Sequence, residues 1–224
     1  MTDSKPTIAV LGGTGDLGGG LAWQLVKAGY SVIVGSRTTE KGETAAKALS
    51  ERAGGVAVQG ADNPAAAALA DIVVMTVPFA NQMPTLETIR EAVQGKIFVD
   101  ATVPLVPPKV MRVQLPTGGS AGMIAQEYLG ENVRVVSAFQ NVAAAHLQAD
   151  EGHFDDCDVL VTGNDADARE QVVQFAQAIG MKAWHAGSIN NSVVAEALTS
   201  VLIFMNKKYK IAGAGIKITG EPQV

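Results

Sequence analysis

Three glycines at a fixed spacing are the first residues whose types could do chemistry. Gly13, Gly15 and Gly18 form the pattern G-x-G-x-x-G inside the segment GGTGDLG. A β-branched run at 7–12, TIAVLG, precedes the pattern, and apolar residues at helical spacing follow it. In that context we expect Gly13 to permit a tight turn, Gly15 to let the backbone approach a pyrophosphate, and Gly18 to pack helix on strand.

This strand–turn–helix unit predicts a dinucleotide site. A helix N-terminus presents free N–H groups and a partial positive charge to phosphate groups. The alternative is a glycine-rich turn that binds no ligand. The residues expected to contact the cofactor here are Gly13, Thr14, Gly15, Asp16, Leu17 and Gly18.

The tip of the second predicted strand, VGSRTTEK at 34–41, indicates which dinucleotide is bound. NAD-binding proteins usually place an acid here to bond the ribose 2′-OH, and this acid would repel a 2′-phosphate. The chain offers Ser36, Arg37 and Lys41, which can donate to a 2′-phosphate. We therefore predict NADP(H). The alternative, ordinary solvated cations, is disfavoured by the dipole of the helix that starts here.

The end of the fourth predicted strand, in MTVPF, is expected to flank the nicotinamide half of the cofactor. Thr76, Val77 and Pro78 lie there, and we add Ala101 at the end of the next strand. The alternative role of Thr76 and Pro78 is plain termination of the strand.

Strands and helices alternate along the first half of the chain. This order predicts an α/β fold with a right-handed, doubly wound parallel sheet of the Rossmann type. The expected strands are 7–12, 30–36, 55–60, 71–78, 96–102, 132–139, 157–163 and 182–187. The expected helices include 38–54, 81–95, about 165–180 and about 191–207. A proline- and glycine-rich loop at 103–122 is expected at the carboxyl ends of the strands, where ligands bind.

Composition excludes several classes of protein. The 224 residues are 47% hydrophobic, which argues against disorder, and the net charge of -5 argues against nucleic acid as a partner. The single cysteine, Cys157, allows neither an internal disulfide nor a cysteine-based zinc site. His146, His153 and His185 lack metal-like spacing, so we expect no metal. We also expect no signal peptide and no membrane span, hence a cytoplasmic protein.

Motifs spread over residues 7–219 resemble the NADPH-dependent reductases of coenzyme F420. They are VLGGTGDLGGGLAWQL, VIVGSRTTEK, VVSAF, DCDVLVTGND, AGSINNSVVAEALTSVLIFMN and GAGIKI. The resemblance implies direct hydride transfer between NADP(H) and the deazaflavin F420, the co-substrate. It also implies a homodimer whose chain has a Rossmann domain at 1–140 and a smaller C-terminal α/β lobe at 141–224. That lobe ends in a long helix and would form the acceptor pocket and the dimer interface.

The resemblance also places residues by position. Thr14, Ser36, Arg37 and Lys41 match the NADP contacts of the family. Val142, Ala144 and Ala214 match apolar positions near the deazaflavin, and Gln140 falls where archaeal members have a histidine.

The same region offers polar side chains that could meet the acceptor. Gln140 and Asn141 could bond the deazaflavin carbonyls, or they could satisfy local backbone groups instead. His146 is a further polar candidate beside the ring, although a core or capping role is more common for such a residue. No side chain is assigned as catalytic, because hydride passes directly between two stacked rings.

Two alternatives to deazaflavin reduction remain open from the sequence. One is an NADPH-dependent reductase of another flavin or of a small carbonyl compound on the same fold. The other is an NADPH-sensing protein without turnover. The small-residue segments AFQNVAAAH and GAGI favour an enzyme, because a sensor needs no site for a second ring.

Overall fold

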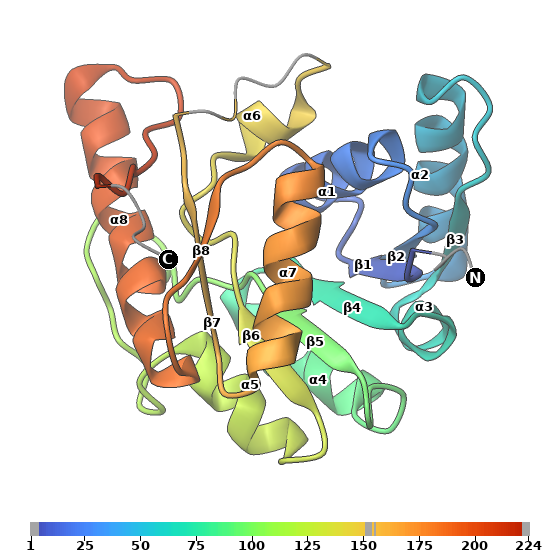
Figure 1. Ribbon diagram of the computed structural model, residues 1–224, viewed down its shortest axis with the longest axis horizontal. Helices are drawn as coiled ribbons and strands as arrows, with labels where there is room; N and C mark the ends of the chain where they lie inside the picture. The colour runs from blue at the N-terminus through green and yellow to red at the C-terminus, as the bar shows by residue number, and fades with distance from the viewer. Residues whose placement is uncertain (1–4, 151–153, 155, 221–224) are drawn as a thin grey trace.

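The computed structural model of the protein describes residues 5–150, 154 and 156–220. Within these residues one sheet runs in the order β3-β2-β1-β4-β5-β6-β7-β8 (Figure 1). Its strands are β1 (Ile8–Leu11), β2 (Val32–Ser36), β3 (Gln59–Asp62), β4 (Ile72–Met75), β5 (Ile97–Asp100), β6 (Arg134–Ser137), β7 (Val159–Gly163) and β8 (Ala183–His185). Neighbouring strands are parallel except β6 and β7, which are antiparallel. The predicted Rossmann-type α/β fold is confirmed.

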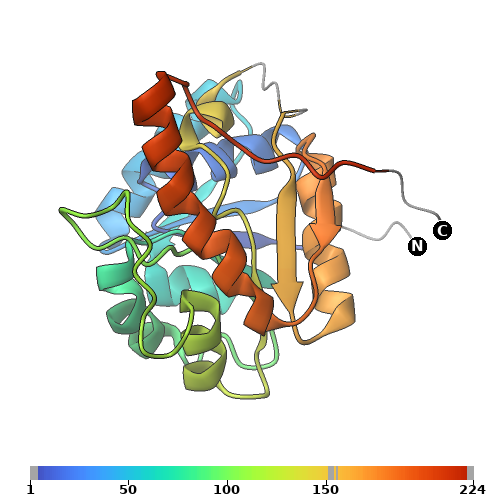
Figure 2. The same cartoon turned by 90° about the vertical axis from the view of Figure 1, so that its left-hand side faces the viewer.

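Helices cover both faces of the sheet (Figures 1 and 2). They are α1 (Asp16–Lys27), α2 (Thr39–Arg52), α3 (Asn63–Leu69), η1 (Phe79–Asn81), α4 (Gln82–Ile89), α5 (Ala121–Leu129), α6 (Ala144–Gln148), α7 (Ala166–Ala178), η2 (Ile189–Asn191) and α8 (Ser192–Tyr209). One core packs α1, α2, α6 and α7 on the sheet, and a second core packs α3, α4 and α5 on the opposite face. Strands β1, β4 and β5 are therefore buried on both sides, which explains their continuous apolar sequences.

Local sequence sets where several helices begin. The side chains of Thr38, Asp62, Ser120 and Asp165 each accept a hydrogen bond from a backbone N–H in the first turn of α2, α3, α5 and α7. These caps satisfy N–H groups that have no partner within the helix. Because Thr38 lies two residues after β2 and Asp62 is the last residue of β3, these two caps also fix how the chain leaves β2 and β3.

The C-terminal part of the chain continues the same sheet. Strand β7 pairs with β6, β8 pairs with β7, and the long helix α8 crosses this end of the molecule (Figure 2). The segment after α8 returns along β7, where Asp158 N–H donates to the carbonyl of Ile216. The proposed division into domains at 1–140 and 141–224 stays a prediction.

The structure corrects three details of the predicted elements. The strand expected at 55–60 begins only at Gln59, because Val56 is exposed and Gly60 packs closely on Gly42 of α2. The helix expected at 81–95 ends at Ile89 and continues as turns. Helix α6 was not predicted.

Among the helices of the described residues, none is long and apolar enough to span a membrane.

Candidate active site

A cavity of about 860 Å³ lies at the carboxyl ends of β1, β2, β3 and β4. Parallel strands of one sheet present these ends at a common edge, where ligands of such folds bind. Part of the predicted cofactor set lines the cavity: Thr14, Gly15, Asp16, Leu17, Ser36, Arg37, Thr76, Val77 and Pro78. The whole lining comes from four segments of the chain, at 12–17, 36–37, 62–64 and 76–88, which meet around one space.

The glycines of the glycine-rich turn have partly different roles from those that the sequence predicts. The left-handed conformation falls on Gly12, with φ of 76°, and not on Gly13. Gly13 is instead required by space, since an added Cβ would lie 2.8 Å from the Val10 carbonyl oxygen. At Gly18 an added Cβ would lie 2.4 Å from Thr76 Oγ1, so this glycine packs α1 on the strand ends as predicted. Neither Gly13 nor Gly18 lines the cavity.

The first turn of α1 keeps its backbone donors available. Its N-cap residue, Gly15, has no side chain to bond the N–H groups of the turn. Unbonded N–H groups at a helix N-terminus attract anions, and the turn borders the cavity. The geometry therefore suits a pyrophosphate at this position.

The end of β2 forms the polar wall next to that turn. Ser36 is almost fully buried, while the adjacent Arg37 is exposed. The neighbouring acid, Asp62 on β3, is engaged by α3 and α2: it accepts from Ala65 N–H at 2.9 Å and from Thr39 Oγ1 at 3.1 Å. Ser36, Arg37 and Asp62 thus line the cavity together, and the Asp62 carboxylate already has partners within the protein.

Two predicted cofactor residues lie outside the cavity wall. Lys41 is exposed on the first turn of α2, where its N–H donates to Thr38 Oγ1. Ala101 is buried behind the wall, and its N–H donates to the Met75 carbonyl at 3.0 Å. Their assignment to cofactor binding stays a prediction.

Several residues of the wall were missed by sequence reasoning: Gly12, Asp62, Asn63, Pro64, Asn81, Pro84, Thr85 and Thr88. Asn63 is the most informative, because its side chain is only 7% exposed and Oδ1 has no hydrogen-bond partner among the described residues. An unpaired buried amide oxygen beside a cavity is expected to gain a partner when a ligand binds. The position after a strand end was the available sequence signal.

The predicted acceptor residues form a separate group near the end of β6. None of them lines the large cavity. Gln140 is buried, and its Nε2 donates to the Asp100 carbonyl at 2.8 Å and to Ser137 Oγ at 2.7 Å. Asn141 is also buried, and its Nδ2 donates to the Asp158 carbonyl at 2.7 Å. The amide nitrogens of both residues thus bond the protein itself, whereas Gln140 Oε1 and Asn141 Oδ1 have no hydrogen-bond partner among the described residues. Their roles toward an acceptor stay predictions.

A strained turn directs the chain into this group. Phe139 has φ of 74°, a conformation that bulky residues rarely adopt, and its ring stacks on Phe175 with centroids 5.6 Å apart. Val142 follows and is buried, whereas Ala144, at the start of α6, is half-buried. Ala214 is half-buried on the segment after α8, where its N–H donates to Asn206 Oδ1 at 2.7 Å.

A buried carboxyl group lies beneath the strand ends. Asp100 accepts from Gln82 Nε2 at 2.6 Å and from Thr102 N–H at 2.8 Å. Burial raises the pKa of Asp100, and the bonds from Thr102 and Gln82 oppose that rise. The side-chain amide of Gln140 donates to the backbone carbonyl of Asp100 and, being neutral, adds no charge to this region.

The histidines do not form a metal site in the described part of the chain. His146 Nε2 lies 3.2 Å from the Ala212 carbonyl oxygen, and His185 pairs with Glu170 at 2.9 Å. His153 lies outside the described residues. Among those that are described, no cluster of three or more histidine, cysteine, aspartate or glutamate residues could hold a metal ion.

Comparison with known proteins relates this geometry to a family. Residues 7–104 match the protein-family model described as NADP oxidoreductase coenzyme F420-dependent. The F420-dependent NADP reductase of Methanothermobacter thermautotrophicus is 41% identical over 223 residues, which cover 96% of each chain. The enzyme of the same name from Methanocaldococcus jannaschii is 41% identical over 95% of this chain and 97% of its own.

A solved structure agrees. It is that of a candidate F420-dependent NADP reductase from Arthrobacter sp. FB24, and it superimposes with a TM-score of 0.81 at 26% identity. The alignment covers 96% of this chain and 100% of that one.

The fold, the glycine-rich turn and the cavity at the strand ends define a Rossmann-type dinucleotide-binding oxidoreductase. Identity of about 40% over nearly the whole chain specifies the group further. The chain belongs to the family of F420-dependent NADP reductases.

Proposed function

We propose that this protein transfers a hydride between NADP(H) and coenzyme F420. The observation that carries the proposal is the wall at the end of β2, where Ser36 and Arg37 replace the acid typical of NAD sites. Near-full-length similarity to F420-dependent NADP reductases supplies the second substrate.

The residues of the chain have distinct tasks in this proposal. The turn from Gly12 to Leu17 and the first turn of α1 hold the pyrophosphate, and Ser36 with Arg37 binds the 2′-phosphate. Residues 76–78 flank the nicotinamide half. When bound, NADP(H) supplies the hydride chemistry, so the protein contributes orientation and exclusion of water rather than a reacting side chain.

The acceptor is tested by offering purified protein NADPH together with F420, FMN or FAD in parallel assays. Rapid oxidation of NADPH with F420 alone is the expected result. Turnover only with FMN or FAD, or with a small carbonyl compound, would make the protein a different reductase. Tight binding of NADPH with no turnover in any mixture would indicate a sensor.

Cofactor choice is tested by the variant Arg37→Ala. Loss of a charge-assisted bond to the 2′-phosphate should raise KM for NADPH by about 10- to 100-fold, while KM for NADH changes little. Arg90→Ala is a suitable control, because Arg90 is exposed and packs over the Tyr128 ring, away from the cavity wall. Equal effects of Arg37→Ala on both cofactors would refute the assignment.

We further propose that the protein is a homodimer. Helix α8 exposes Val194, Val201, Phe204 and Tyr209, and the loop before α5 exposes Leu115. Exposed apolar side chains in this number on one helix are typical of an interface. A monomeric mass by light scattering at micromolar concentration would refute the dimer.

The chain is proposed to act in the cytoplasm. Its one cysteine, Cys157, is buried and unpaired, as expected for a protein that folds without disulfide formation.

A further inference from the structure

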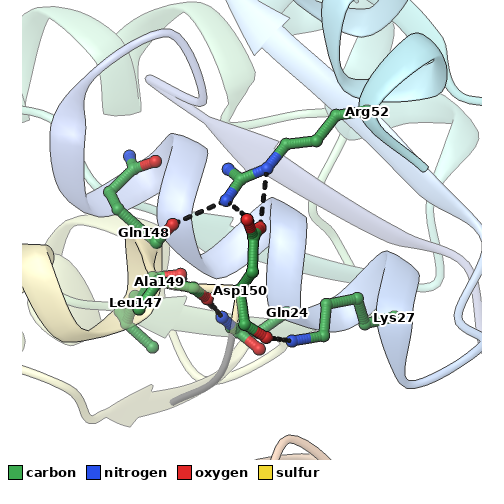
Figure 3. A network of polar contacts seen from close by, with 7 residues as sticks. All are labelled: Gln24, Lys27, Arg52, Leu147, Gln148, Ala149 and Asp150. Atoms are coloured by element: carbon green, nitrogen blue, oxygen red, sulfur yellow. Dashed lines mark hydrogen bonds and ion pairs between the residues drawn. The ribbon is translucent and has the colours of Figure 1, made fainter.

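Helix α6 is only five residues long, yet side chains from distant helices bind its free carbonyl groups. Gln24 Nε2 donates to the Leu147 and Ala149 carbonyls at 2.8 and 2.9 Å (Figure 3). Arg52 donates to the Gln148 carbonyl at 2.6 Å. The last carbonyls of a helix have no partners within it, so these donors fix the C-terminal end of α6.

Further bonds tie the residue after α6 to the same donors. Arg52 pairs with the Asp150 carboxylate, Nη2 to Oδ1, at 2.5 Å, and Lys27 donates to the Asp150 carbonyl (Figure 3). We call Gln24, Lys27, Arg52 and their partners Leu147 to Asp150 the clasp. It joins segments more than ninety residues apart in sequence.

The donors of the clasp belong to α1 and α2, the two helices whose N-terminal ends lie next to the cavity. Gln24 and Lys27 belong to α1, whose first turn lines the cavity at Asp16 and Leu17. Arg52 ends α2, which starts two residues after Arg37. Because an α-helix of this length bends little, α1 and α2 each fix the position of α6 relative to one end of the cavity, where a phosphate group is proposed to bind.

Helix α1 is shaped to receive α6. A Cβ added at Gly20 would lie 2.7 Å from Leu147 Cβ, so only glycine permits this approach. One more bond reaches the cavity wall directly, since Gln148 Nε2 donates to the Asp16 carbonyl at 2.7 Å. The third glycine of the run at 18–20 therefore serves packing of α6 rather than the dinucleotide turn.

The other side of α6 contacts the segment that carries Ala214. His146 Nε2 lies 3.2 Å from the Ala212 carbonyl oxygen. Gly213 has φ of 90°, and an added Cβ would approach His146 Nε2 to 2.7 Å. Helix α6 thus lies between the first turn of α1 and residues 212–214.

We propose that α6 sets the position of the hydride acceptor relative to NADP(H), with Gln148 as a positioning residue. The inference rests on the proposed function and on the positions near the deazaflavin that the family resemblance assigns to Val142, Ala144 and Ala214. Gln148 acts through the Asp16 carbonyl and touches no reacting atom. Because hydride transfer requires near-contact of two rings, a displacement of about 1 Å lowers the rate by about 100-fold.

The test compares Gln148→Met, which keeps the length of the side chain but loses the donor, with Gln148→Lys, which restores a donor. Gln174→Met is the matched control, because Gln174 is exposed on α7, where its side chain bonds Glu170. Four quantities are measured: the single-turnover rate of hydride transfer from NADPH to F420, the isotope effect of 4-deuterated NADPH on steady-state turnover, the Kd of NADPH by fluorescence, and the thermal unfolding midpoint.

Gln148→Met is expected to slow single-turnover transfer by about 10- to 100-fold, with a much smaller change in the Kd of NADPH. The steady-state isotope effect should rise as transfer becomes rate-limiting, and Gln148→Lys should recover part of the rate. A lower thermal stability with unchanged transfer rate and isotope effect would overturn the inference. Wild-type protein that fails to reduce F420 would instead refute the proposed function, and the inference with it.

Discussion

Glu196 of α8 is a buried carboxyl group whose titration should be visible in the stability of the protein. Its Oε2 accepts from Ala121 N–H at 2.6 Å and its Oε1 from Gly122 N–H at 3.0 Å, so it caps α5 from another helix. Burial raises the pKa of Glu196 from 4.5 to about 7, although those two bonds oppose the rise. The nearby Asp100 carboxyl group contributes in the same direction.

The sign and size of the effect follow from linkage. A pKa that is higher in the folded chain means that the folded state binds the proton more tightly. The contribution of Glu196 is therefore fully present below about pH 4.5 and is lost as the pH rises through about 7. The difference between these values corresponds to about 3 kcal/mol in total. About 1.5 kcal/mol of it is lost between about pH 6 and about pH 8.5.

The assay is urea unfolding of wild type and Glu196→Gln across that pH range, at one fixed protein concentration. The range avoids acidic solutions in which a chain of net charge -5 approaches neutrality and precipitates. The difference between the unfolding free energies of wild type and variant should shift by about 1.5 kcal/mol toward the variant as the pH rises. Other carboxyl groups largely cancel in this difference, apart from Asp100, which senses the removed charge.

The control is Glu91→Gln, a substitution of an exposed glutamate beyond α4. Its unfolding free energy should run parallel to that of wild type over the whole range. Parallel curves for Glu196→Gln as well would refute the reasoning, because they would mean that folding leaves the pKa of Glu196 unchanged.

Two further outcomes follow from buried polar groups. Asn63→Ala should raise the Kd of NADPH, measured by cofactor fluorescence, by about 3- to 10-fold, because one hydrogen bond to the ligand is lost. An unchanged Kd would show that the unpaired Asn63 Oδ1 does not bond the ligand. Burial raises the pKa of the Cys157 thiol, so its reaction with a disulfide reagent should be slow in native protein and accelerate in urea. Labelling at the rate of an exposed thiol would contradict the buried position.

The parts of the site that the sequence predicts are those encoded by short, contiguous motifs. The G-x-G-x-x-G turn needs only a strand before it and a helix after it, and the order of parallel strands then brings residues 36–37 and 76–78 to the same edge. Sequence reasoning missed the part of the cavity wall that Asn81 and Thr88 form, because their position depends on how α4 packs, and no local sequence pattern specifies that packing. Strand β3 begins later than the predicted strand at 55–60. Close packing of Gly60 on Gly42, rather than the apolar residues before Gln59, decides which residues pair with β2.

Helix α6 shows a second limit of sequence reasoning. The segment AAHLQ is too short to form a stable helix alone, and its sequence contains no cap. Its stabilising partners, Gln24 and Arg52, lie more than ninety residues earlier. Gly20 is the sequence signal for this contact, because the G-x-G-x-x-G pattern does not require a glycine there.

The buried groups behind the strand ends explain how the region around Gln140, where the acceptor residues are predicted, remains low in charge. Gln82 and Gln140 hold the carboxyl and carbonyl groups of Asp100 with neutral amides, and burial raises the pKa of that carboxyl group. A cation at position 140 would favour ionisation of Asp100 and draw water toward it. Hydride transfer between two flat rings needs no charged side chain, but it does need water excluded. The uncharged amide at Gln140 therefore fits an enzyme whose part in the reaction is to position two rings.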